Sequence, residues 1–239
     1  MSLSRGPKII SNGLVLYLDA ANNKSYPRTG TTWYDLSGNN NNGTLTNGPT
    51  FSVANMGSIL FDGTNDYGTL PNNPLYTLYS SNLTNQKWTI ECVCNITSLS
   101  DQCLIGPYND SIGSGIYVNF SGAQSNKPLM YTDGGNYLYG GESIANVGNR
   151  IITYVFDGSS ASRKQYIYIN GVLISSKTTT NPGDTYPLLY NNFTFCNDGG
   201  AGGSRYLSGT IYSFKLYKKA LTQSEISQNY NAVRGRFNI

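Results

Sequence analysis

Short apolar runs with a two-residue period recur along this chain, and stretches rich in Gly and Asn separate them. The run KWTIECVCNI at 87–96 is a clear example, because Trp88 and Cys92 fall on one side of a strand and Glu91 falls on the other. Roughly a dozen such runs are present, and no helical pattern alternates with them. This organisation predicts an all-β fold and disfavours a parallel sheet of βαβ units.

Local signals place a hairpin and an ordered loop within this pattern. Asn170-Gly171 lies between two β-rich runs and predicts a hairpin with a type I′ turn. The polar segment at 20–49 has no period, but it contains Trp33, whose burial would stabilise an ordered loop. No Pro- or Ser-rich linker and no charge run divides the 239 residues, so we expect one domain.

The stretch at 206–237 changes from a strand pattern to a helix pattern. Thr222 is a good N-cap residue, and Glu225 three residues later completes a capping box. Downstream, Ile226 and Tyr230 recur at helical spacing and give the helix an apolar face. We therefore expect one short C-terminal helix that packs on the strands and has a structural role.

The net charge of the chain is +3, which is too small to indicate nucleic acid as a partner. Basic residues do gather near the C-terminus, and we interpret them as solvated side chains of an edge strand and a helix end. They are Lys215, Lys218, Lys219, Arg234 and Arg236.

The sequence also bears on membranes and cysteines. No apolar run approaches the roughly 20 residues that span a bilayer, and MSLSRGPKII lacks the apolar core of a signal peptide, so we expect synthesis in a cytoplasm and no membrane insertion.

Cys92 and Cys94 point to the same face of one strand and cannot form a disulfide with each other, whereas Cys103 and Cys196 would pair only if the fold brought them together. We expect buried, reduced thiols.

An ordered set of motifs gives the chain a family resemblance. The motifs are GLVLYLDA, WYDLSGNNNNGTL, SILFDGTNDY, WTIE, IITYVFDG with YIYINGVL, and LSGTIYSFKLYKKALTQSEI. Over about residues 11–233 they resemble the laminin G-like branch of the concanavalin A-like lectin/glucanase superfamily. The resemblance implies a two-sheet antiparallel jelly-roll sandwich with the helix packed beside it. We place this single domain at 11–239, after an N-terminal arm at 1–10.

A narrower resemblance concerns two segments. LYLDAANNKSYPRTGTTWYDLSGNNNNGTL and ALTQSEISQNYNA are similar to virion structural proteins of tailed phages, especially phages of marine bacteria. This similarity implies a capsid-decoration or tail-fibre-associated attachment module that resides in the virion, docks on capsid or tail subunits as an oligomer or within an assembly, and binds cell-surface polysaccharide. The alternatives are a stand-alone carbohydrate-binding module and a degenerate glycoside hydrolase.

Enzymatic activity is not expected. The chain has no histidine, which excludes Ser-His and Cys-His nucleophile pairs. Glucanases of the superfamily carry an E-x-D-x-x-E cluster on one strand, because two carboxylates must flank the scissile bond. The corresponding strand of this chain has Glu91 alone, and the other glutamates are Glu142 in a Gly-rich loop and Glu225 in the capping box.

Glycan binding needs exposed aromatic faces with Asn, Asp or Gly nearby, since the C–H faces of sugar rings stack on aromatic rings. The middle of the chain concentrates tyrosines of this kind, although tyrosines at strand ends also serve in packing. The candidate residues are Tyr108, Asn109, Asp110, Tyr131, Asp133, Asn136, Tyr137 and Tyr139.

Calcium is the cofactor that the family resemblance implies, since relatives often bind it at a sheet rim through carboxylate, amide and backbone oxygens. The alternative for such residues is turn chemistry, because Asp before Gly accepts hydrogen bonds from its own backbone. The oxygen-rich candidates are Asp62, Asn65, Asp66, Asn197 and Asp198.

Overall fold

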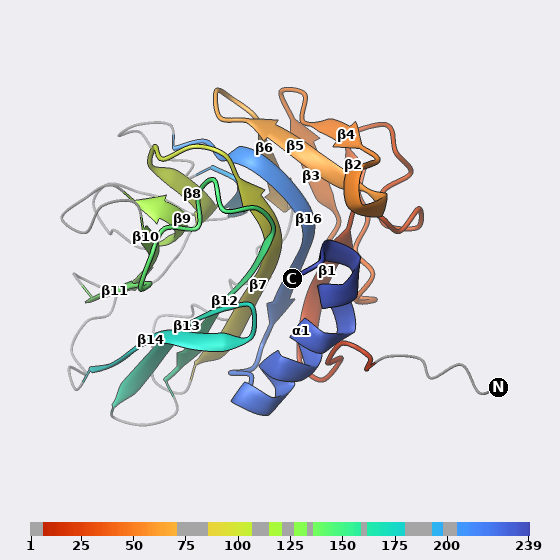
Figure 1. Ribbon diagram of the computed structural model, residues 1–239. Helices are drawn as coiled ribbons and strands as arrows, with labels where there is room; N and C mark the ends of the chain where they lie inside the picture. Colours follow the sequence, from red (N-terminus) through yellow and green to blue (C-terminus); the bar gives the residue numbers. More distant parts are fainter. Residues whose placement is uncertain are drawn as a thin grey trace.

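The computed structural model describes residues 7–70, 86–106, 115–120, 127–132, 136–158, 162–179, 193–197 and 205–239. Within these residues it contains sixteen strands, a short 3-10 helix η1 (Ala54–Met56) and one α-helix. The strands form two antiparallel sheets that face each other (Figure 1). This architecture confirms the predicted all-β jelly-roll sandwich with a short C-terminal helix.

The first sheet, sheet A, contains the longest strands of the fold. Its order is β14 (Val172–Thr179), β13 (Arg163–Ile169), β12 (Arg150–Asp157), β7 (Lys87–Ile96), β16 (Ser208–Tyr217), β5 (Ser58–Asp62) and β4 (Thr50–Ser52), and β1 (Leu14–Asp19) also pairs with β16. The run at 87–96 is therefore an inner strand of this sheet. The C-terminal strand lies directly beside the first strand of the chain.

The second sheet, sheet B, carries most of the short strands. Its order is β11 (Asn136–Tyr139), β10 (Lys127–Thr132), β9 (Gly115–Phe120), β8 (Gln102–Gly106), β15 (Phe193–Phe195), β6 (Tyr67–Leu70), β3 (Gly43–Thr46) and β2 (Thr32–Trp33). β5 and β6 are consecutive but belong to different sheets, so the turn at 63–66 crosses from one layer to the other.

The hydrophobic core fills the space between the sheets. Trp88 of β7 stacks on Phe156 of β12 with ring centroids 5.5 Å apart. Trp33 is fully buried and meets Phe195 of β15 edge-on at 6.1 Å, which confirms its predicted role as the anchor of the polar segment. Asn170 and Gly171 have φ values of 50° and 77°, as a type I′ turn between β13 and β14 requires.

The four cysteines are buried and free. Burial raises the pKa of the Cys92 and Cys196 thiols well above the ordinary value, so both are protonated at neutral pH. This outcome confirms the prediction of reduced structural thiols.

The helix α1 (Gln223–Phe237) lies on the outer face of sheet A, beside β1 and β16 (Figure 1). Thr222 accepts a hydrogen bond from the Glu225 amide, and the Glu225 carboxylate accepts one from the Thr222 amide, so the predicted capping box is present. Ile226 packs in a buried cluster with Val155 of β12 and Tyr217 of β16. The helix therefore covers the sandwich, as its apolar face predicts.

The charge interpretation is wrong for two residues. Arg236 is not solvated, because its side chain is 13% exposed and its Nη1 forms an ion pair with Asp19 at 2.7 Å. Lys215 lies on the inner strand β16, not on an edge strand, and its side chain is 0% exposed. Its ammonium forms an ion pair with Glu91 of β7 at 2.7 Å. Lysine can be buried in this position because Glu91 supplies the counter-charge.

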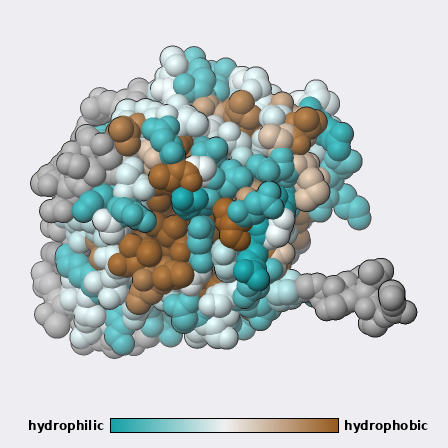
Figure 2. All heavy atoms as spheres, in the orientation of Figure 1, coloured by the Kyte–Doolittle hydropathy of each residue, from teal (hydrophilic) through white to brown (hydrophobic). Residues whose placement is uncertain are grey.

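The surface mixes polar and apolar groups, with an apolar area near the centre of the face drawn in Figure 2. Among the described residues, Val53 and Met56 are exposed beside and within η1, and Val172 and Leu173 are exposed at the start of β14. These apolar side chains therefore belong to separate elements.

Candidate functional site

Three tyrosines share the outer face of sheet B at its β10–β11 edge. Tyr131 of β10 pairs in register with Tyr137 of β11, and Leu129 pairs with Tyr139. The intervening Met130 packs in the core between the sheets, so the odd-numbered residues of both strands point away from that core. Two-residue periodicity thus brings Tyr131, Tyr137 and Tyr139 together, and we refer to these three residues as the tyrosine platform.

The rings of the tyrosine platform are nearly parallel. Tyr131 and Tyr137 stack with centroids 4.4 Å apart and an interplanar angle of 9°, and Tyr137 and Tyr139 follow at 6.1 Å and 16°. Tyr137 is 39% exposed. Tyr131 and Tyr139 are partly buried against Cys103 and Leu129, which are themselves fully buried. The platform therefore has a packed base and an exposed aromatic surface.

The polar groups of the platform suit hydrogen bonding. Burial, followed by the neighbouring Tyr137, raises the pKa of the Tyr139 phenol, which therefore keeps its proton at neutral pH and can donate a hydrogen bond. Lys177 of β14 donates from Nζ to the backbone carbonyl of Tyr137 at 3.2 Å. This bond ties the edge strand of sheet B to the edge strand of sheet A and places a cation beside the platform.

The other predicted glycan contacts are only partly located. Asn136 pairs with Thr132 in the β10–β11 register, one residue before Tyr137. Tyr108, Asn109, Asp110 and Asp133 lie outside the described residues.

The predicted calcium residues of the β5–β6 turn are engaged with the backbone. Asp62 Oδ1 accepts hydrogen bonds from the amides of Thr64 at 2.8 Å and Asn65 at 3.3 Å. The Thr64 amide is the main cause that lowers the pKa of the Asp62 carboxyl. Asp66 is buried, and its Oδ2 accepts a hydrogen bond from the Asp62 amide at 3.1 Å. These bonds are the turn chemistry that is the alternative to metal ligation for this sequence.

The structure describes only one residue of the second predicted calcium segment. Asn197 is buried, and its carbonyl accepts a hydrogen bond from Thr194 Oγ1 at 2.9 Å, whereas Asp198 lies outside the described residues. Within the part of the chain that the structure describes, no group of three or more Cys, Asp or Glu side chains could hold a metal ion. Calcium binding at these residues stays a prediction.

A pocket of about 420 Å³ lies where β4, β5 and β16 are neighbours in sheet A, and it is called here the β5 pocket. It brings Asp62 and Asp66 together with residues that the sequence did not single out. These are Asn47, Gly48, Thr50, Leu60, Phe61, Thr97, Gly209 and Thr210. The pairing of β16 with β5 brings residues 209–210 to the turn at 62–66, and the hydrogen bond from the Thr97 amide to the Ser208 carbonyl at 3.0 Å brings Thr97 there as well.

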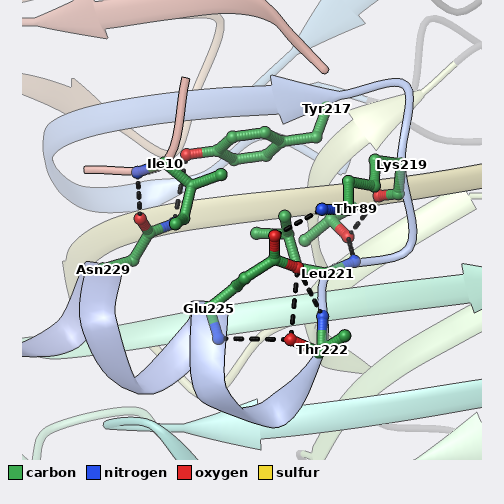
Figure 3. A network of polar contacts seen from close by, with 8 residues as sticks. All are labelled: Ile10, Thr89, Tyr217, Lys219, Leu221, Thr222, Glu225 and Asn229. Carbon is green, nitrogen blue, oxygen red and sulfur yellow. Dashed lines mark hydrogen bonds and ion pairs between the residues drawn. The ribbon is translucent and has the colours of Figure 1, made fainter. Parts of the chain in front are cut away.

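Glu91, the lone glutamate of the strand at 87–96, lies under α1 instead of facing solvent. Its Oε1 accepts from Lys215, and its Oε2 accepts from Asn229 of the helix at 3.1 Å. Figure 3 shows Asn229 also reaching the Tyr217 hydroxyl at 3.0 Å, while its side-chain oxygen accepts from the Ile10 amide at 2.8 Å. The Glu91 carboxylate is 1% exposed and both of its oxygens are engaged, so it is not presented to a ligand.

Comparison with known proteins identifies the superfamily. The family model Laminin_G_3, described as the concanavalin A-like lectin/glucanases superfamily, matches residues 62–227. Among curated proteins, none shows a significant sequence match to this chain.

Solved structures share the fold at low sequence identity. Domain 4 of AbnA, a GH43 extracellular arabinanase from Geobacillus stearothermophilus solved in complex with arabinotriose, superposes with a TM-score of 0.66 at 15% identity, covering 91% of this chain and 98% of that one. The binding domain of Paraclostridial Mosquitocidal Protein 1 has a TM-score of 0.65 at 18% identity, covering 93% of this chain and 52% of that one. A structure of botulinum neurotoxin type C, whose cell entry is described as dependent upon interaction with two ganglioside molecules, has a TM-score of 0.66 at 15% identity, covering 94% of this chain and 52% of that one. The chain therefore spans nearly all of the arabinanase domain and about half of each toxin chain.

No helix among the described residues is both long and apolar enough to cross a membrane.

Proposed function

Because the chain belongs to the concanavalin A-like lectin/glucanases superfamily, we propose that it is a glycan-binding module that holds an oligosaccharide on the tyrosine platform. The observation that carries this proposal is the near-parallel stack of Tyr131, Tyr137 and Tyr139 with Tyr137 39% exposed. The three rings stack on one another and so cover part of their own faces, and the exposed part of the Tyr137 ring is the aromatic surface that meets the C–H groups of a sugar.

The surroundings of the platform suit a sugar better than a purely apolar ligand. The protonated phenol of Tyr139 and the ammonium of Lys177 both donate hydrogen bonds, and sugar hydroxyls accept them. The packed base formed by Cys103 and Leu129 keeps the stack in place before a ligand arrives, which lowers the entropic cost of binding.

Structural neighbours support a carbohydrate ligand. The arabinanase domain is described in complex with arabinotriose, and the cell entry of neurotoxin type C is described as dependent upon interaction with two ganglioside molecules. At 15% sequence identity these neighbours share the fold alone with this chain. The ligand of this chain is therefore argued from its own tyrosines.

The proposal is tested by screening the protein on a glycan array and by titrating arabinotriose and the best array ligand into it. We expect Tyr137→Ala to weaken binding by about tenfold or more, since it removes the exposed ring of the stack. Tyr34→Ala is the matched control, because Tyr34 is 44% exposed and belongs to no part of the platform. Equal binding by Tyr137→Ala and Tyr34→Ala, or no binding by the wild-type protein, would refute the proposal.

We propose further that binding proceeds without hydrolysis. The support is the position of Glu91 beneath α1, with its carboxylate engaged by Lys215 and Asn229. Incubation of the protein with its array ligand, followed by chromatography of the sugars, should return the intact oligosaccharide. Release of shorter sugars would overturn this part of the proposal.

The setting that we propose for this module is a virion, where it would dock on capsid or tail subunits. The support is the similarity of the segments 16–45 and 220–232 to structural proteins of tailed phages. Mass spectrometry of purified particles should detect the protein at a stoichiometry comparable to other structural subunits. Its absence from particles would contradict the virion assignment but leave glycan binding untouched.

A further inference from the structure

The β5 pocket lies at the edge of sheet A opposite to β14, whereas β11 of the tyrosine platform contacts β14. The pocket is thus separate from the platform. We propose that it binds a single sugar unit that carries a protonated amine, and this inference does not rest on the proposed function. The argument comes from the charge of the pocket, the free acceptor oxygen of Asp66 and the size of the pocket.

The lining of the pocket is acidic and rich in hydrogen-bond acceptors. Asp62 and Asp66 both line it, and the described residues that line it include no lysine or arginine. Asn47 donates its side-chain amide to the Asn65 carbonyl at 2.9 Å, which leaves the Asn47 side-chain oxygen as a further acceptor. A ligand that fits this lining must bring donors, and a positive charge is favoured over a negative one.

Asp66 is the pocket residue whose carboxylate most clearly lacks a hydrogen-bond donor. Its side chain is buried, with a residue exposure of 5%, and Oδ2 accepts from the Asp62 amide at 3.1 Å. Its other carboxylate oxygen accepts no hydrogen bond from the rest of the described chain, although the residue lines the pocket. This oxygen is not sealed from solvent, so a hydrogen-bond donor of a ligand in the pocket can reach it. Burial raises the pKa of Asp66, and an ammonium group would restore the favourable environment of the charged form.

Size and shape argue for a sugar over a metal ion. The volume of about 420 Å³ lies in the range of small-molecule sites and greatly exceeds that of a single cation. Leu60 is 40% exposed on the pocket wall and offers an aliphatic surface to a ring. The hydroxyls of Thr50 and Thr210 add donors and acceptors around it. Calcium prefers six to eight oxygen ligands, and no cluster of three acidic side chains occurs in the described parts of the chain.

Isothermal titration of the wild-type protein with glucosamine, glucose, n-butylamine and calcium chloride tests the ligand class. We expect glucosamine to bind at least about tenfold more tightly than glucose, because the amine reaches a carboxylate, and more tightly than n-butylamine, which lacks hydroxyls. Equal binding of glucose and glucosamine would overturn the role of the amine. Equal binding of n-butylamine would overturn the sugar, and calcium binding that displaces glucosamine would indicate a metal site instead.

Two variants locate the binding. Asp66→Asn should lower the affinity for glucosamine by about tenfold or more, since it removes the charge and keeps the shape. If thermal unfolding shows that this variant does not fold, Leu60→Trp tests whether glucosamine binds in the pocket, because the larger side chain fills the pocket from an exposed wall position. Leu99→Trp is its matched control, with Leu99 50% exposed and not part of the pocket. Unchanged glucosamine binding in Leu60→Trp would refute the site, whichever result the platform variants give with oligosaccharides.

Discussion

Replacement of Lys215 by Met should destabilise the protein far more than loss of an ordinary surface lysine. Lys215 and Glu91 are 0% and 1% exposed, and their charged atoms are 2.7 Å apart. The change leaves Glu91 with the Asn229 amide at 3.1 Å as a donor but without a counter-charge, in a place that water does not reach. Removing one partner of a buried pair costs about 3–5 kcal/mol. For a chain of this length we expect the melting temperature to fall by roughly 6–20 °C.

Urea unfolding at pH 7, followed by far-UV circular dichroism, measures the change in the free energy of unfolding. The matched control is Lys87→Met on the same sheet, where Lys87 and Asp157 are 3.9 Å apart with side chains 46% and 29% exposed. An exposed pair of this kind contributes about 1 kcal/mol or less. The double variant Glu91→Gln/Lys215→Met should recover part of the loss, because it leaves no buried charge unpaired. A Lys215→Met variant no less stable than Lys87→Met would refute the reasoning.

Two further predictions concern buried side chains of sheet A and of the helix that covers it. Ile226→Ala should lower the free energy of unfolding by about 2–5 kcal/mol, because Ile226 is 1% exposed in the cluster under α1, and an unchanged thermal melting curve would contradict the structural role of the helix. Stability should fall as pH rises above about 10, because burial raises the pKa of the Tyr217 and Tyr154 phenols in the folded protein, so the unfolded chain releases these protons first. Urea unfolding between pH 9 and 11 measures this decline, and Tyr217→Phe should make it shallower; an equal slope in that variant would argue against the assignment.

Local periodicity accounts for most of what the sequence predicts correctly. The alternation at 87–96 places Trp88 in the core and Glu91 on the opposite face, as the structure has it. The capping box at Thr222 is equally local, since its two partners are three residues apart. Such features depend on neighbours in the chain, so a single sequence contains the information they need.

Burial on the outer face of sheet A depends on distant partners instead. The alternation of β16 places Lys215 on the correct face, but the degree of burial follows from α1, which covers that face. The ion pair joins residues 124 positions apart, and its formation requires β7 and β16 to be neighbours in a given register. The pattern of one strand predicts neither the burial of Lys215 nor its pairing with Glu91, because both depend on residues that are distant in the sequence. The β5 pocket could not be predicted from the turn at 62–66 for the same reason.

The cover on sheet A also bears on where a ligand can bind. Asn229 and the apolar cluster around Ile226 hold α1 over the strands that carry Glu91 and Lys215. A ligand could reach those strands there only by displacing the helix and exposing a charged pair, at a cost of several kcal/mol. The outer face of sheet B at β10–β11 requires no such displacement, because Tyr137 is already exposed there. The helix therefore closes the outer face of sheet A over Glu91 and Lys215, whereas the tyrosine platform is open to the glycan that we propose for it.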